Sequence, residues 1–202
     1  MSTITIVALF IALITSSACF AEPPQKASRD LLSLVAATEK LDTFSRGDVN
    51  GDGLKDYLFI VTLPRRTNDD CLGGSRVLKI ALRDPSGRLR IAASSPGVIM
   101  CEEEGGVLGD PLMGLTARGG SFAIGHAGGG NCRWGKWLTF RYSTKGRDWY
   151  LSRATYSQSH ACERESRTPD VDTYRYPRHF KRITLADFSW DLLDNLIYGR
   201  TP

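Results

Sequence analysis

Short stretches rich in β-branched and aromatic residues recur along most of the chain and define its hydrophobic pattern. Several of them alternate apolar with polar positions, as expected of strands with one buried face. They lie at residues 57–63, 76–83, 89–93, 122–126, 137–142 and 149–156. Sequences typical of turns separate several of them, at residues 84–88 (DPSGR), 117–121 (ARGGS) and 144–148 (TKGRD). The pattern therefore predicts antiparallel hairpins.

Helical spacing of apolar residues is confined to the two ends of the chain. Residues 28–40 carry Leu and Val on one face, and Ser28 is a plausible N-cap, which predicts a short amphipathic helix. Residues 185–198 show a similar pattern, and Gly199 is a typical stop. The fold class that follows is mainly β, an antiparallel sheet or barrel-like sandwich with short N-terminal and C-terminal helices.

The first 21 residues form a separate segment. They are uncharged, contain an apolar run at residues 4–14 and end in small residues, as a secretory signal peptide does. The run is too short for a transmembrane helix, which needs about 20 residues. Cleavage after Ala21 would release a soluble protein into the periplasm, whereas cleavage before Cys19 would leave a lipid anchor. Ser16 stands where lipoprotein signals prefer Leu, which favours soluble export.

Residues 22–202 are expected to form one domain, because their number suits a single hydrophobic core. Four cysteines belong to this part, namely Cys71, Cys101, Cys132 and Cys162. An even number in an exported chain favours two disulfides, with buried free thiols as the alternative. Three pairings exist. We expect Cys101 to pair with Cys132, since each lies in a Gly-rich stretch, which leaves Cys71 with Cys162.

Charge and motifs narrow the function classes. The formal net charge is +4 with basic and acidic residues interspersed, so a nucleic-acid partner is not expected, and membrane association would require the lipid at Cys19. The sequence has no nucleophile elbow, zinc-protease, phosphate-loop or dinucleotide motif, and its three histidines are dispersed. We therefore expect a protein without enzymatic activity.

One stretch, DVNGDGLKD, has the spacing of a calcium-binding loop. Its candidate ligands all offer oxygen and are Asp48, Asn50, Asp52, Asp56 and, through its carbonyl, Leu54. Counted from Asp48 they occupy positions one, three, five, nine and seven, and Gly53 holds position six, where calcium loops turn sharply. Position twelve is Phe59 instead of the bidentate Glu of a helix–loop–helix site, and a strand follows. The alternative is a turn in which these side chains cap their own backbone.

Two Gly-rich stretches, residues 102–114 and 125–137, and the long connection 157–180 are candidate contact surfaces. Tight hairpin geometry is the alternative explanation for the glycines. The side chains that suit contact with a partner are Asn131, Arg133 and Trp134, with Tyr174 and Tyr176 in reserve. An Arg or an aromatic residue on a rigid loop can pair with the catalytic carboxylates of a glycosidase and fill its sugar subsites.

The order DVNGDGLKD, GGVLGDP, HAGGGNCRW, WLTFRYS and DWYLSR resembles a group of bacterial periplasmic proteins with a single FG-GAP-like calcium loop. The resemblance covers about residues 42–156. The group includes immunity proteins of type IV secretion systems, which are similar to inhibitors of I-type lysozyme. It implies a β-rich fold, a calcium-stabilised turn, and inhibition of a peptidoglycan-cleaving toxin by an inserted loop. The SGxxY inhibitory loop is absent here, so no inhibitory residue carries over.

The first functional hypothesis is therefore a periplasmic, calcium-binding inhibitor or immunity protein whose partner is a secreted peptidoglycan hydrolase. The second is an envelope-associated structural or adhesive calcium-binding module. An exported hydrolase comes third, because no acid, base or nucleophile is marked.

Overall fold

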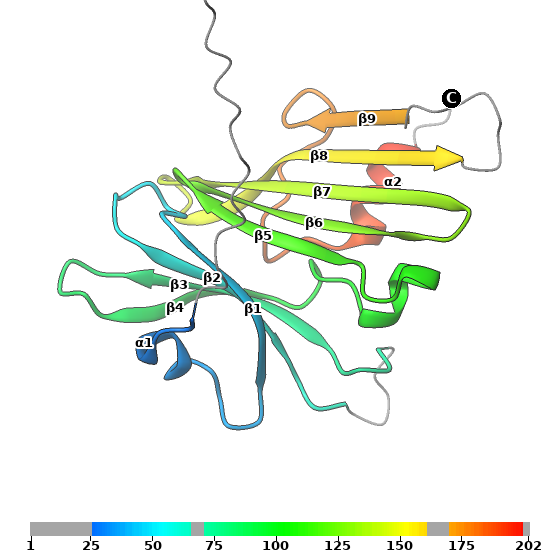
Figure 1. The fold of residues 1–202 in the computed structure, drawn as a ribbon. Helices are drawn as coiled ribbons and strands as arrows, with labels where there is room; N and C mark the ends of the chain where they lie inside the picture. The colour runs from blue at the N-terminus through cyan, green and yellow to red at the C-terminus, as the bar shows by residue number, and fades with distance from the viewer. Residues whose placement is uncertain (1–25, 66–70, 161–169, 200–202) are drawn as a thin grey trace, which may run out of the picture.

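The computed structural model describes residues 26–65, 71–160 and 170–199. The predicted signal peptide at residues 1–21, together with Cys19 and Cys162, lies outside the described residues. Two antiparallel sheets make up most of the described chain, and Figure 1 shows them as two layers. Within these ranges no helix has the length and apolar character needed to cross a membrane.

Each sheet follows the order of the chain. The four-stranded sheet consists of β1 (Lys40–Gly47), β2 (Asp56–Thr62), β3 (Arg76–Arg83) and β4 (Leu89–Ser95). The five-stranded sheet consists of β5 (Leu112–Arg118), β6 (Ser121–Gly129), β7 (Cys132–Ser143), β8 (Asp148–His160) and β9 (Asp170–Arg175). The predicted mainly β fold is confirmed. Over the part of the chain that the structure describes, both sheets are open, so the fold is a sandwich and not a closed barrel.

One hydrophobic core lies between the sheets. Alternate residues of the central strands point into it, as the period of a strand requires. The four-stranded sheet contributes Leu58, Ile60, Leu78 and Ile80, and the five-stranded sheet contributes Phe122, Ile124, Leu138, Phe140 and Leu151. The rings of Phe122 and Phe140 stack with their centroids 5.1 Å apart.

A second cluster covers the outer face of the four-stranded sheet. Leu31 of the N-terminal helix α1 (Arg29–Leu32) is completely buried there against Phe59 and Val61 of β2. Strand β2 is consequently buried on both faces, which explains why its sequence is a continuous apolar run.

The helices are shorter than the sequence pattern predicts. Ser28 caps α1 as expected, but the helix ends at Leu32, so the prediction of a helix to residue 40 is wrong. Glu39 instead accepts a hydrogen bond from the Ala36 backbone N–H and pairs with Lys79 of β3, and strand β1 begins at the next residue. The C-terminal helix α2 (Trp190–Tyr198) is capped by Ser189 and ends at Gly199.

The disulfide pairing differs from the expected one. Cys71 is bonded to Cys101, with their Cα atoms 5.3 Å apart, so the expected pairs Cys101–Cys132 and Cys71–Cys162 are wrong. Cys101 is the N-cap of a 3₁₀ segment, η1 (Glu102–Leu108), which lies beside the connection from β2 to β3, where Cys71 stands. Cys132 begins β7, is exposed and forms no disulfide with a described residue.

Candidate metal centre

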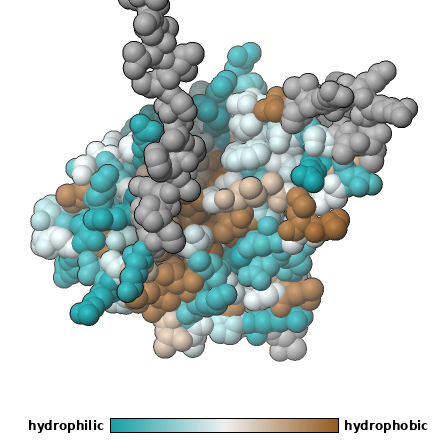
Figure 2. Space-filling model, in the orientation of Figure 1, coloured by the Kyte–Doolittle hydropathy of each residue, from teal (hydrophilic) through white to brown (hydrophobic). Residues whose placement is uncertain are grey.

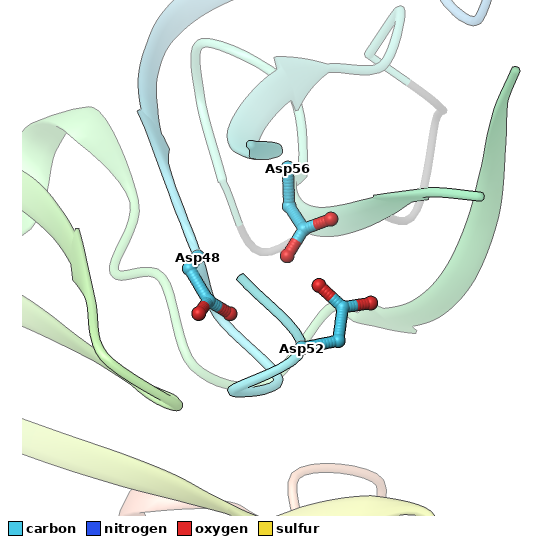
Figure 3. Close-up of side chains that lie close together, drawn as sticks. All are labelled: Asp48, Asp52 and Asp56. Carbon is cyan, nitrogen blue, oxygen red and sulfur yellow. The ribbon is translucent and has the colours of Figure 1, made fainter. Parts of the chain in front are cut away.

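The loop that joins β1 to β2 brings three carboxylates together. Asp48, Asp52 and Asp56 each offer one oxygen, and these oxygens all lie within 4.8 Å of one another. Figure 3 shows the three side chains directed toward a common space between the loop and the start of β2. The three carboxylates predicted as metal ligands thus converge.

The loop is shaped by hydrogen bonds from its own backbone. The Asp48 carboxylate accepts from the N–H of Gly51 at 2.6 Å and from that of Gly53 at 3.0 Å. Both glycines have positive φ, 84° and 86°, a conformation that a residue with a Cβ adopts only with strain. Asp52 in turn accepts from the Leu54 N–H at 2.8 Å. Gly53 therefore makes the sharp turn predicted at position six.

Asp56 is the anchor of the cluster. It is completely buried, and its two oxygens accept from the backbone N–H groups of Val49 at 3.0 Å and Arg83 at 2.9 Å. Burial raises the pKa of Asp56, the two N–H groups lower it, and the charges of Asp52 and Asp48 raise it further. A cation bound between the carboxylates would offset this repulsion.

The carboxylates keep capacity for a cation although each accepts backbone hydrogen bonds, since an ionised carboxylate has about four lone-pair sites. Asn50 lies in the same loop, where its amide donates to Asp52 at 2.9 Å and accepts from the Asp52 N–H at 3.1 Å. Ligation by Asn50 and by the Leu54 carbonyl stays a prediction. Phe59, at position twelve, is completely buried and offers no ligand. The arrangement is a group of hard oxygen donors able to hold a metal ion.

The loop also joins the two sheets. The Asp48 carbonyl accepts from the Gly120 N–H at 3.1 Å, at the turn between β5 and β6. The Val49 carbonyl accepts from the Trp149 indole N–H at 2.8 Å, on β8, and the Val49 side chain is buried in the core. Order in the loop is therefore tied to the packing of one sheet on the other.

The residues predicted to contact a partner fall in two regions. Asn131 and Arg133 are exposed where β6 turns into β7. Trp134 is half-buried and lines a cavity of about 500 Å³. Tyr174 packs against Tyr156, and Tyr176 follows β9 and packs against Tyr150, so neither belongs to the turn.

Segment η1 adds an exposed apolar surface beside that turn, made by side chains that were not predicted as contact residues. Val107 is 86% exposed and Leu108 is 51% exposed. A Cβ on Gly130 would lie 3.0 Å from Val107 Cγ2, so η1 and the β6–β7 turn are adjacent. Figure 2 shows hydrophobic residues on the surface over η1. In the sequence, this exposed apolar surface is marked only by a Val-Leu pair within a stretch of Gly and Glu.

Two restraints hold η1 in place. The Cys71–Cys101 disulfide fixes its start. The Arg76 guanidinium, whose side chain is 4% exposed, pairs with Glu102 at 3.2 Å and with Asp110 at 2.6 Å, so it joins the two ends of the segment. Its hydrogen bonds to Asp110 raise the pKa of Arg76 and lower that of Asp110. This segment is consequently a rigid loop.

Comparison of the chain with protein-family models, with curated proteins and with solved structures gave no match.

Proposed function

We propose that this protein is a calcium-binding inhibitor of the bacterial periplasm that blocks a secreted peptidoglycan-cleaving enzyme. The observation that carries the proposal is the restrained η1 loop with two exposed apolar side chains beside the β6–β7 turn. We call Val107, Leu108, Asn131 and Arg133 the blocking surface.

The choice of calcium follows from the oxygen cluster. Calcium takes oxygen ligands at about 2.3–2.6 Å in flexible geometry, so two ligands on opposite sides of one ion lie about 4.6–5.2 Å apart. The separations of at most 4.8 Å between the Asp48, Asp52 and Asp56 oxygens suit such an ion. Magnesium demands stricter octahedral geometry at about 2.0–2.1 Å, and it usually keeps several waters.

The blocking surface suits insertion into an enzyme cleft for two reasons. A loop held by a disulfide and by ion pairs to the buried Arg76 side chain loses little conformational freedom on docking, so more of the contact energy appears as affinity. Val107 and Leu108 supply apolar area, while Arg133 is an exposed cation suited to the catalytic carboxylates of a glycosidase.

The metal is tested by thermal unfolding with and without a chelator. The expected result is a lower melting temperature on chelation, because an ion that binds only the folded chain stabilises it by about 2.7 kcal/mol at one hundred times its dissociation constant. Asp52→Ala should abolish the response. Asp172→Ala, the same substitution on the exposed strand β9, should retain it. Identical melting curves for the parent protein with and without chelator would refute the metal site.

Inhibition is tested by the rate at which peptidoglycan is cleared by lysozyme-type enzymes, an I-type lysozyme among them. The parent protein should slow clearance, and Val107→Asp and Arg133→Ala should weaken the effect without lowering the melting temperature. Arg90→Ala, on the exposed part of β4, is the matched control. No slowing at micromolar protein would refute the inhibitor and leave the metal site standing.

An envelope-associated structural or adhesive module is the second candidate. The observation that favours it is the outer face of the five-stranded sheet, where Met113 is 65% exposed and Trp137 is 41% exposed. Sedimentation of the protein with insoluble peptidoglycan, lost in Trp137→Ala, together with unimpaired clearance by the enzymes, would favour this module over the inhibitor.

A further inference from the structure

Three arginines gather on the outer face of the five-stranded sheet. Leu138 and Phe140 of β7 point into the core, so Thr139 and Arg141 point outward. The strand register places Arg153 of β8 opposite Thr139, and Arg175 of β9 opposite Arg153. All three arginines are exposed and line a pocket of about 390 Å³, which we call the arginine pocket.

These arginines lack the acidic partners that four other described arginines have. Arg76, Arg83, Arg88 and Arg182 each form an ion pair with a carboxylate. No described carboxylate lies within ion-pair distance of the three arginines of the pocket. Like charges directly opposite each other on neighbouring strands are destabilising, and Arg153 and Arg175 are such a pair. An anion between them would remove the repulsion.

The rest of the pocket offers hydroxyl groups and an aromatic wall. Ser121, Thr139 and Ser152 line it. The hydroxyls of Ser121 and Ser152 already donate to the backbone carbonyls of Arg118 and Thr139, which leaves Thr139 as the residue whose hydroxyl can donate to a ligand oxygen. Tyr150 and Tyr176 form the wall, with their rings edge to face and the centroids 5.4 Å apart. Arg182 lies over Tyr150 at 4.6 Å and pairs with Asp148 at 2.6 Å, which fixes the wall.

We propose that the arginine pocket binds the oxyanion group of a small anionic ligand, a phosphate or a carboxylate. Guanidinium groups pair with both through two parallel hydrogen bonds, which makes Arg the residue suited to such groups. The volume exceeds that of a single oxyanion and falls within the usual range of small-molecule sites, about 300–1,000 Å³. The tyrosine wall therefore contacts the remainder of the ligand.

This site is separate from the blocking surface. Thr139 stands seven residues along β7 from Cys132, about 23 Å at the rise of a strand. The loop that carries Asp48, Asp52 and Asp56, called the metal loop, is also distinct, because none of its carboxylates lines the pocket. Its contact with the pocket is through the backbone, where the Asp48 carbonyl accepts from Gly120, between the pocket residues Gly119 and Ser121. The inference therefore goes beyond the proposed inhibitor and stands or falls independently of it.

The test is calorimetric titration with inorganic phosphate and, separately, with glutarate, in a chloride buffer of low ionic strength without added calcium. At least one anion should bind. Arg153→Gln and Arg175→Gln should each weaken binding by about tenfold, since each removes a charged hydrogen-bond partner. Arg90→Gln, the same change on the four-stranded sheet, should bind as the parent does. Repetition in the Asp52→Ala protein excludes a contribution from an ion in the metal loop.

Thermal unfolding is a second test, because a substitution that weakens anion binding should stabilise the anion-free protein. Without the anion, Arg175→Gln should melt at a higher temperature than the parent, because the like-charge pair is gone. With the anion, the increase in melting temperature should be smaller in the variant than in the parent. Binding of phosphate alone would assign a phosphoryl ligand, binding of glutarate alone a carboxylate, and binding of both the shared oxyanion chemistry. No binding at millimolar concentrations, or equal binding by Arg175→Gln and Arg90→Gln, would overturn the proposal.

Discussion

His126 makes the stability of this protein depend on pH in a way that a single substitution can isolate. The side chain is completely buried on β6. Its Nε2 accepts a hydrogen bond from the Met100 backbone N–H at 3.4 Å, and its Nδ1 has no hydrogen-bond partner among the residues that the structure describes. Protonation would place a second N–H donor against the Met100 N–H, so the folded state holds a neutral imidazole.

The pKa shift gives the sign and the size of the effect. The pKa of His126 is lowered from 6.5 to about 4, mainly by burial and further by the charges of Arg76 and Lys136, while Asp110 raises it. Between these values the unfolded chain binds a proton that the folded chain does not, so the free energy of unfolding decreases as the pH falls. The contribution is fully present above pH 6.5 and is lost as the pH falls toward 4. The difference between 6.5 and about 4 corresponds to at most about 3 kcal/mol.

Urea unfolding at pH 7.5 and at pH 5.0, followed by tryptophan fluorescence without reductant, measures this contribution. Over that interval the His126 contribution amounts to about 2 kcal/mol. His126→Gln retains an acceptor for the Met100 N–H and cannot titrate, so the variant should lose about 2 kcal/mol less than the parent between the two pH values. Ile124→Val, buried on the same strand, is the control for packing. It should cost about 0.5–1.5 kcal/mol equally at both pH values.

The quantity to compare is the change in the free energy of unfolding between pH 7.5 and pH 5.0, in the variant and in the parent. This comparison cancels the contribution of every carboxylate that titrates alike in the two proteins. If His126→Gln and the parent lose the same free energy of unfolding between pH 7.5 and 5.0, a buried neutral His126 is not the source of the dependence. If Ile124→Val changes the pH dependence as much as His126→Gln does, the effect belongs to core packing.

Three further predictions concern restraints on the loops. In Gly128→Ala the new Cβ would lie 2.8 Å from the Gly105 Cα, so the substitution should cost about 1–3 kcal/mol of unfolding free energy, measured with urea. Arg76→Met should cost about 3 kcal/mol in the same assay, because it leaves the nearly buried Asp42 carboxylate and the more exposed Glu102 and Asp110 without their cation, and a loss well below 1 kcal/mol would contradict it. Peptide mapping of non-reduced protein from an oxidising compartment should find the Cys71–Cys101 bridge and a second one between Cys132 and Cys162, the pair left by elimination, whereas an alkylated Cys132 thiol would contradict that pairing.

Features set by local sequence were predicted well. The stretches at 57–63 and 76–83 match β2 and β3 within a residue, because apolar β-branched runs bounded by turn residues leave the backbone few alternatives. The Ser28 cap and the turn at Gly53 were found for the same reason, since each depends on groups a few residues apart. Convergence of the metal-loop carboxylates is likewise a consequence of spacing within nine residues.

Features set by distant partners were missed. Strand β9 has charged residues and little apolar character, and it is a strand because β8 offers an unpaired edge beside it. Strand β1 was missed as well: its first residue, Lys40, was the last of the predicted helix, and no strand was predicted for the rest. The Cys71–Cys101 disulfide and the arginine pocket arise where the fold brings distant segments together, so no local sequence pattern predicts them.

The two carbonyl contacts of the metal loop, to Gly120 and to Trp149, have a thermodynamic consequence. A ligand that orders the loop and a force that separates the sheets act on one equilibrium, and such coupling is reciprocal. If a cation bound in the loop stabilises the packing of the two sheets, intact packing of the sheets strengthens binding of that cation by the same free energy. The affinity of this loop for a cation would therefore report how well the two sheets pack against each other.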